Sequence, residues 1–191
     1  MEMLGHRHLP ITQQQAWEAL NDADTLKKCI PGCDKFELTG DNTYAVALAL
    51  KIGPVSAKFQ GKVMLSDIVA PDGYKLTFEG QGGVAGFAKG SSSVSLKPAQ
   101  GEGSELDYTV QAQVGGKIAQ LGQRLIDGAA KSTADDFFKR FEAEMQSRYG
   151  PPPEAAPVDP DAADDDKPGR VAGLMQKMGF GRKDKADGEA G

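Results

Sequence analysis

With 191 residues, of which 39% are hydrophobic, the chain has enough material for one ordinary core but too little for two full domains. Its formal net charge of −5 provides no overall positive field, and it contains no nucleic-acid motif, so we expect no nucleic-acid partner. No apolar run approaches the roughly 18 residues that a membrane-spanning helix needs. Two cysteines and the lack of an apolar signal segment predict a reducing, cytoplasmic location.

The first 30 residues predict one strand followed by two short helices. The segment Leu4 to Leu9 has the composition of a short strand. Thr12 and Gln15 then have the spacing of a capping box, which indicates a helix start. A second helical stretch through Leu26 should end before Pro31 and Gly32, since proline disfavours helix in the residue before it.

Residues 33–114 alternate between apolar and polar side chains, most clearly from Leu106 to Val114. Turn sequences at Gly40-Asp41-Asn42, Gly53-Pro54 and Pro71-Asp72-Gly73 divide this region into hairpins. We therefore predict an antiparallel meander of about six strands plus the N-terminal strand. The glycines between Gly80 and Gly90 should bend this sheet.

After Gly115 and Gly116, apolar residues from Ile118 to Met145 recur every three or four positions, which predicts a long helix of some 30 residues. Such a helix could cross the concave face of the sheet and leave an apolar pocket, a usual kind of small-molecule site. An ordinary packed core is the alternative. The ligand-binding candidates, selected by periodicity, are Leu50, Phe59, Val63, Leu76, Phe78 and Phe87 on the sheet, and Ile118, Leu121 and Leu125 on the helix.

Polar residues of the domain form no convincing catalytic or metal site. Asp107, Glu105 and Lys58 fall on the solvent-facing phase of their strands, so no catalytic residue is assigned. His6 and His8 share one face of a strand and should be exposed. The inward-facing tyrosines could donate a hydrogen bond to a quinone or lipid carbonyl, or their hydroxyls could reach the rim of the sheet; they are Tyr44, Tyr74 and Tyr108.

Two further motifs suggest chemistry but are better explained structurally. Cys29 and Cys33 lack the additional ligands of a zinc site, so we expect two thiols packed at a turn, with a reversible disulfide as a remote alternative. The glycine-rich segment 80–90 lies between predicted strands and lacks the ending of a phosphate-binding loop. We interpret it as a bend, with Phe87 as a hydrophobic flap.

Composition changes near Gly150, which divides the chain into a domain at 1–149, a disordered linker rich in proline and aspartate at 150–169 and a basic amphipathic tail at 170–191. Apolar and basic residues at helical spacing predict that the tail docks on a membrane surface or on a partner protein, and an inert tail is the alternative. The docking candidates are Arg170, Val171, Leu174, Met175, Lys177, Met178, Phe180, Arg182 and Lys183.

Several segments together resemble the G-subunit family of carbon monoxide dehydrogenase over roughly residues 1–145. They are Cys29-Ile30-Pro31-Gly32-Cys33, Lys51-Ile52-Gly53-Pro54-Val55, Phe59-Gln60-Gly61-Lys62-Val63, residues 80–90 and residues 113–122. This resemblance implies an α+β, START-like helix-grip fold, in which a curved antiparallel sheet of about seven strands wraps around a long C-terminal helix. It also implies an apolar, lipid-sized cavity and a molybdenum-containing dehydrogenase as partner.

The resulting hypothesis is a non-enzymatic carrier that binds a quinone, menaquinone or ubiquinone, or another lipid. It would link the dehydrogenase to the inner face of the cytoplasmic membrane by peripheral contact, with no covalent cofactor and no metal. A recruitment or assembly factor that transports no ligand is the first alternative. A cyclase or hydrolase-like enzyme on the same fold is the second.

Overall fold

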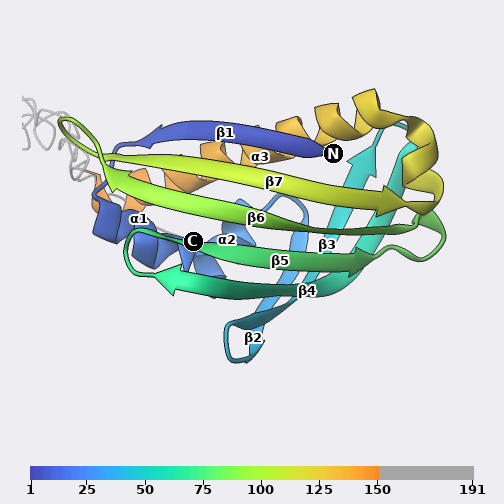
Figure 1. Ribbon diagram of the computed structural model, residues 1–191, viewed down its shortest axis with the longest axis horizontal. Coiled ribbons are helices and arrows are strands. Elements are labelled where there is room, and N and C mark those ends of the chain that lie inside the picture. The colour runs from blue at the N-terminus through green and yellow to red at the C-terminus, as the bar shows by residue number, and fades with distance from the viewer. Residues whose placement is uncertain (151–191) are drawn as a thin grey trace, which may run out of the picture. The chain divides into compact units, whose positions relative to one another are not determined.

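The computed structural model describes residues 1–150, which form one compact unit (Figure 1). The residues expected to form the tail, and all of the expected linker except Gly150, lie outside the described residues. Among the described helices, none combines the length and apolar character needed to cross a bilayer. The strands are β1 (Glu2–Leu9), β2 (Cys33–Gly40), β3 (Thr43–Ile52), β4 (Val55–Val69), β5 (Gly73–Gln81), β6 (Phe87–Pro98) and β7 (Ser104–Gly115).

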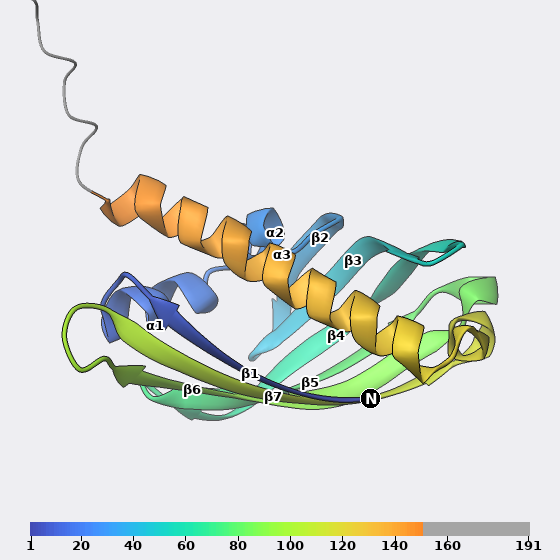
Figure 2. The same cartoon turned by 90° about the horizontal axis from the view of Figure 1, so that it is seen from above.

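All seven strands form one antiparallel sheet in the order β1-β7-β6-β5-β4-β3-β2. Strands β2 to β7 are neighbours in chain order, as the predicted meander requires, and β1 returns to the edge beside β7, a position that the sequence analysis did not assign. The first strand begins at Glu2, two residues before the expected start, because its pairing with β7 continues to Gln111. Figure 2 shows the sheet curving beneath the long helix α3, which lies across its concave side. The predicted helix-grip fold is therefore confirmed.

Two short helices, α1 (Gln13–Leu20) and α2 (Ala23–Cys29), connect β1 to β2. The predicted capping box at the start of α1 is present, with Thr12 and Gln15 each bonding the other's backbone amide. Asp22 caps α2 by accepting hydrogen bonds from the amides of Asp24 and Thr25. Both helices end before Pro31, in agreement with the sequence prediction.

The C-terminal helical region is divided into two parts. A 3-10 helix, η2 (Gly116–Leu121), precedes α3 (Gln123–Tyr149), and Gly122 between them has a φ of 87°. A left-handed backbone of this kind ends one helix and starts another, so the prediction of an uninterrupted helix from Ile118 was wrong. The 27 residues of α3 span about 40 Å at 1.5 Å per residue, which covers the length of the concave face.

The main core lies where the C-terminal half of α3 meets α1 and the adjacent ends of β1, β6 and β7. Phe141 and Met145 on α3 are fully buried there, together with Leu9, Leu96 and Leu106 from the sheet. Close packing of large side chains at this end fixes α3 against the sheet. We call this region the packed end.

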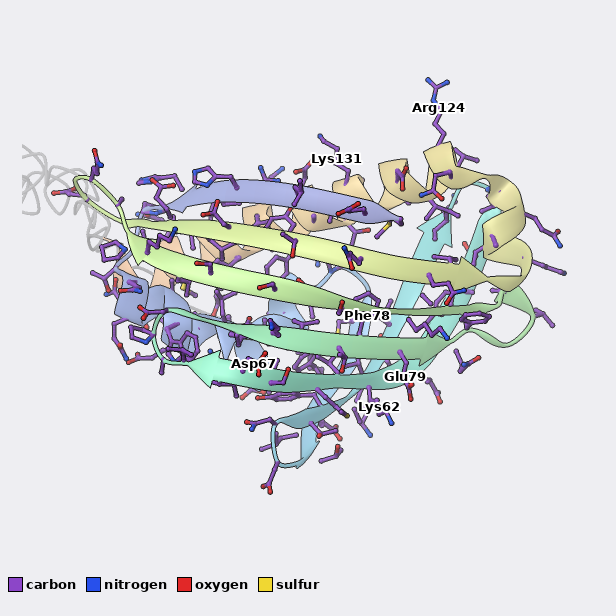
Figure 3. All side chains as sticks on the ribbon, viewed as in Figure 1. Lys62, Asp67, Phe78, Glu79, Arg124 and Lys131 are labelled. Atoms are coloured by element: carbon purple, nitrogen blue, oxygen red, sulfur yellow. The ribbon has the colours of Figure 1, made fainter. Side chains whose placement is uncertain are left out.

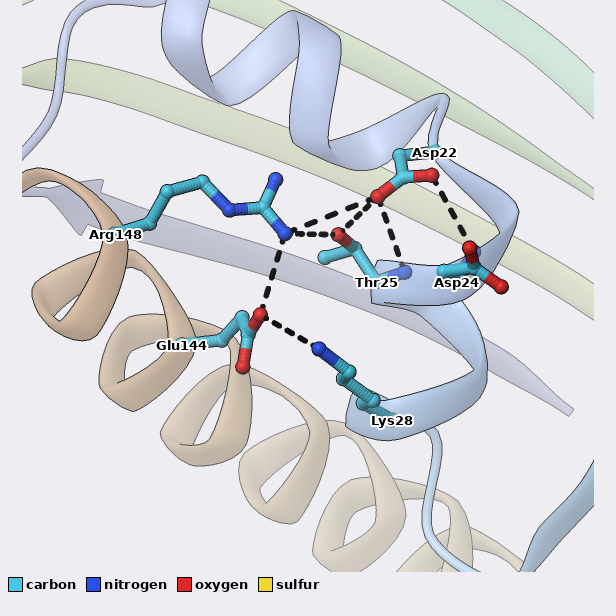
Figure 4. Close-up of polar contacts among 6 residues, drawn as sticks. All are labelled: Asp22, Asp24, Thr25, Lys28, Glu144 and Arg148. Carbon is cyan, nitrogen blue, oxygen red and sulfur yellow. Dashed lines mark hydrogen bonds and ion pairs between the residues drawn. The ribbon is translucent and has the colours of Figure 1, made fainter.

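A polar network reinforces the packed end by joining α2 to α3 (Figure 4). The Arg148 guanidinium donates to Thr25 Oγ1 at 2.9 Å and to Glu144 Oε1 at 3.2 Å. Its Nη2 lies 3.8 Å from Asp22 Oδ2, and Lys28 Nζ lies 3.2 Å from the same Glu144 oxygen. The hydrogen bond from Thr25 lowers the pKa of Asp22, and that from Lys28 lowers the pKa of Glu144.

Candidate functional site

An apolar cavity of about 460 Å³ lies between the N-terminal half of α3 and the concave face of the sheet. We call it the first chamber. A second chamber of about 370 Å³ adjoins it, and the two share wall residues that include Val46, Val63 and Phe78. Each volume falls in the range of about 300 to 1,000 Å³ that is usual for small-molecule sites.

Small residues on α3 create the first chamber. Ala129, Ala130 and Ala134 line it, together with Thr133. Their short side chains leave a gap beneath the helix, which the opposite wall of large side chains does not fill. In the packed end the same helix carries Phe141 and Met145, which are fully buried and line neither chamber.

The second chamber lies beneath the α1–α2 region and is walled by aromatic residues of the sheet. Phe36 and Tyr44 pack together with ring centroids 5.0 Å apart, and both line this chamber. Tyr74, 7% exposed, lines it as well, and burial raises the pKa of its hydroxyl. The phenol of Tyr74 therefore stays protonated as a hydrogen-bond donor across the physiological pH range.

Tyr108 lines both chambers and stacks on Phe138 of α3, with ring centroids 5.4 Å apart. A Cβ atom placed on Gly5 would overlap the Tyr108 ring and its hydroxyl oxygen, so glycine in β1 makes room for this side chain. The hydroxyl of Tyr108 thus lies over the β1 edge. This geometry agrees with the sequence-based alternative in which a tyrosine hydroxyl reaches the rim of the sheet.

The structure places most of the predicted site residues at the cavity. Leu50, Phe59, Val63, Phe78 and Ile118 line the first chamber, while Leu76 lines the second.

Phe87, Leu121 and Leu125 do not appear in either wall. Phe87 is adjacent to the wall residue Ala88 in β6 and therefore lies on the opposite face of the sheet, where it packs over Gly115. It does not form a flap over the cavity. Leu125 is 48% exposed because the break at Gly122 changes the direction in which α3 presents its first turn.

Several cavity residues were missed by the sequence analysis. Ile126 lines the first chamber beside the alanines of α3, and Ile30 lines both chambers from the turn after α2. Ile126 belongs to the predicted helical period and was detectable. Ala129 also belongs to that period, but no alanine was selected as a wall residue, because the selection favoured large apolar side chains.

Other polar candidates lie away from the cavity. His6 and His8 are exposed, as predicted, and bind carboxylates of β7: His6 Nδ1 lies 2.7 Å from Asp107 Oδ1, and His8 Nδ1 lies 2.9 Å from Glu105 Oε1. The hydrogen bonds of His6, first that to Asp107, raise its pKa. Among residues 1–150, no group of three or more side chains that could hold a metal ion is present.

The two cysteines are free thiols at the end of α2 and at the start of β2. Cys29 is buried in the core of the packed end, and this burial raises its pKa to about 11. Cys33 is half-buried, and its thiol donates to the carbonyl of Lys35 at 3.2 Å. A protonated, buried Cys29 thiol is unreactive, in keeping with a packing role.

The glycine-rich segment connects β5 to β6 through the short 3-10 helix η1 (Gly83–Ala85). It lies between strands, as predicted, and Ala85 is buried against Phe59 and Ile118. The segment therefore helps to close one end of the first chamber.

Comparison with known proteins places this architecture in a family. The family model for the G subunit of carbon monoxide dehydrogenase (CoxG) matches residues 5–146. A crystal structure of a conserved protein from Geobacillus kaustophilus is similar at 37% sequence identity and a TM-score of 0.73; the match covers 77% of this chain and 96% of that one. No curated protein matches the chain.

More distant structures share the fold alone. A protein from Thermus thermophilus matches at 14% identity with a TM-score of 0.59, over 78% of this chain and 99% of its own. The Zhui aromatase/cyclase from a Streptomyces species matches at 12% identity with a TM-score of 0.57, over 78% of this chain and 96% of its own. At these identities the similarity concerns the helix-grip architecture and carries no functional assignment.

Proposed function

Because the chain belongs to the CoxG family of carbon monoxide dehydrogenase, we propose that it is a non-enzymatic accessory protein that binds a quinone or another lipid. The proposed partner is a molybdenum-containing dehydrogenase of the carbon monoxide dehydrogenase type. The ligand would be held in the two chambers between the sheet and α3. The protein would connect the dehydrogenase to the inner face of the cytoplasmic membrane.

The observation that carries this proposal is the pair of adjoining apolar chambers, of about 460 and 370 Å³. A quinone combines a flat ring with an apolar chain, and such a molecule gains free energy when it leaves water for an apolar cavity. The aromatic wall at Phe36, Tyr44 and Tyr74 suits a flat ring, and a tyrosine hydroxyl could donate to its carbonyl. Menaquinone and ubiquinone are the ligands to test first.

The composition of the walls supports binding over chemistry. Among the described residues that line the two chambers, no histidine or cysteine occurs, and Glu79 is the single carboxylate. Its Oε1 lies 3.2 Å from Lys62 Nζ across neighbouring strands, and Figure 3 shows both side chains at the lower front of the sheet. General acid–base catalysis requires titratable groups that converge on a substrate, and this pair is used as a surface ion pair.

The proposed ligand can be tested by purifying the full chain without detergent and analysing it by native mass spectrometry and organic extraction. We expect a quinone to be recovered. Replacing Ala129 and Ala134 by leucine fills the first chamber and should reduce the recovered ligand at least tenfold. Ala143→Leu is the matched control, because Ala143 is an exposed residue of the same helix.

Two results would separate the functions that the family allows. An empty protein that still binds the dehydrogenase would overturn the ligand-carrier proposal and leave recruitment or assembly as its function. Equal ligand content in the filled variant and in Ala143→Leu would show that the ligand lies elsewhere than in the first chamber.

A further inference from the structure

Three loop regions meet at the end of the domain opposite the packed end. They are residues 51–58 around the β3–β4 turn, residues 80–90 around η1 and residues 113–126 around η2 and the first turn of α3. Ala85 and Ile118 belong to one buried cluster that also contacts Ile52 and Val55. Leu125 lies beside the β3–β4 turn, since a Cβ placed on Gly53 would be 3.7 Å from its Cδ1. We call these three regions the tip.

The tip is positively charged although the chain as a whole carries −5. It contains five basic residues and no acidic residue; the basic residues are Lys51, Lys58, Lys89, Lys117 and Arg124. Lys58 Nζ lies 3.9 Å from Asp34 Oδ2, whereas the other four form no ion pair with a described residue. Figure 3 shows Arg124 extending away from the body of the domain. Lys89 lies opposite Glu79 in the β5–β6 register, so Lys51, Lys117 and Arg124 are the cations most available to an external anion.

Exposed apolar side chains accompany this charge. Val84 in η1 is 83% exposed, and Leu125 on α3 is 48% exposed. Pro54, in the β3–β4 turn, is also exposed. Protein surfaces that bind the interface of an anionic bilayer typically combine apolar side chains with surrounding basic groups. The apolar side chains insert among the lipids and the cations contact the headgroups.

The tip is continuous with the proposed ligand site. Ile52, Ile118 and Ile126 belong to the tip and line the first chamber. We infer that the tip docks on an anionic phospholipid surface, so that an apolar ligand enters the first chamber from the bilayer without crossing water. This inference rests on the proposed function for the identity of the cargo. An acidic protein surface could also attract the cations, but it would not explain why the apolar side chains and the chamber share one end.

The test uses the domain alone as well as the full chain, because the basic C-terminal residues could bind vesicles by themselves. Residues 1–150 form a compact unit, and a relative whose chain is 96% covered by the match consists of little else, so this part should fold independently. Co-sedimentation is measured with vesicles of phosphatidylglycerol and phosphatidylethanolamine, and with vesicles of phosphatidylcholine as the uncharged comparison. Circular dichroism verifies that each variant is folded.

The tip variant combines Val84→Asp, Lys117→Glu and Arg124→Glu. Its matched control combines Val69→Asp, Lys97→Glu and Lys139→Glu, which produces the same change in charge at exposed positions outside the tip. We expect residues 1–150 to bind anionic vesicles, the tip variant to bind at least tenfold more weakly and the control to bind within twofold of the unchanged domain. Each basic group near an anionic surface contributes roughly fivefold.

The inference would be overturned if residues 1–150 did not bind anionic vesicles, or if the tip variant and its control bound them equally weakly. So would a tip variant that keeps vesicle binding but loses the dehydrogenase, because the tip would then be a protein-docking surface. Ligand recovery from the full chain is a separate readout. If the full chain contains no ligand but the tip variant still loses vesicle binding, the carrier proposal is contradicted while the inference that the tip docks on a membrane is supported.

Discussion

The two halves of α3 rest on the same sheet but meet it in opposite ways. The C-terminal half buries Phe141 and Met145 among residues of β1, β6 and β7, and Arg148 joins it to α2. The N-terminal half presents alanines to an open chamber. Tight packing at one end can hold the helix in place, so the other end does not need to be filled. A binding cavity in a small domain thus depends on stability supplied elsewhere.

The largest expected effect comes from breaking the packed end. Phe141→Ala removes a fully buried ring and should lower the free energy of unfolding by about 3 to 5 kcal/mol. Ile126→Ala, which removes a side chain that already borders the first chamber, should cost only about 1 to 2 kcal/mol. Urea titration of the ligand-free protein measures both values. Equal losses would contradict the division into a packed and a hollow end.

Insertion of larger side chains should have opposite effects at the two ends. Ala19 of α1 is fully buried in the core of the packed end, so Ala19→Leu should destabilise the protein by about 1 to 3 kcal/mol. Ala134→Leu extends into the first chamber and should stabilise the ligand-free protein by about 0.5 to 1 kcal/mol. Thermal unfolding after ligand extraction checks the signs. Destabilisation by both would mean that the chamber is too rigid to accept a side chain.

A smaller effect than the loss of a core ring concerns the polar network of the packed end. Arg148→Met should lower the free energy of unfolding at pH 7 by about 1 kcal/mol, since its ion pairs are partly exposed. The pKa of Asp22 is lowered first by Thr25 and that of Glu144 first by Lys28, and Arg148 contributes to both, so the two carboxylates stabilise the fold above their unfolded pKa values. This contribution is lost as the pH falls through the folded values.

The difference between wild type and Arg148→Met should therefore shrink as the pH is lowered from about 5 to 3. Unfolding titrations at successive pH values measure it. Thr133→Val, which removes a hydroxyl group from the cavity side of α3 without a change in charge, is the control. Its effect should not change over that range, because Thr133 contacts a backbone carbonyl rather than an ionisable group.

Sequence patterns predicted the architecture because each strand has one solvent-facing and one inward-facing side. The alternation from Leu106 to Val114 matches the pairing of β7 with β6 and β1, and the turn residues mark the hairpins. The capping box at Thr12 identified the start of α1 to the residue. These signals depend on residues that are close in sequence, so they can be recognised without knowledge of the tertiary packing.

The site was predicted less completely, since a cavity forms where large side chains are absent. Ala129 falls on the predicted helical period, but small side chains were not selected as wall residues, although Ala129 and Ala134 create the chamber by their small size. Leu121 and Leu125 were assigned to the wall because the three-to-four spacing continues across Gly122, while the actual helix changes course there. Phe87 could have been placed correctly by counting back along β6 from the buried Leu96, which puts Ala88 on the inner face.

The two chambers also determine how the domain should respond to compression. Void volume inside a folded protein disappears on unfolding, so a ligand-free domain with chambers of about 460 and 370 Å³ should unfold at lower hydrostatic pressure than a fully packed one. A bound molecule occupies that volume and removes the advantage that pressure gives to the unfolded chain. The pressure at which the domain unfolds therefore reports how much of the cavity volume is occupied, whatever the chemical identity of the bound molecule.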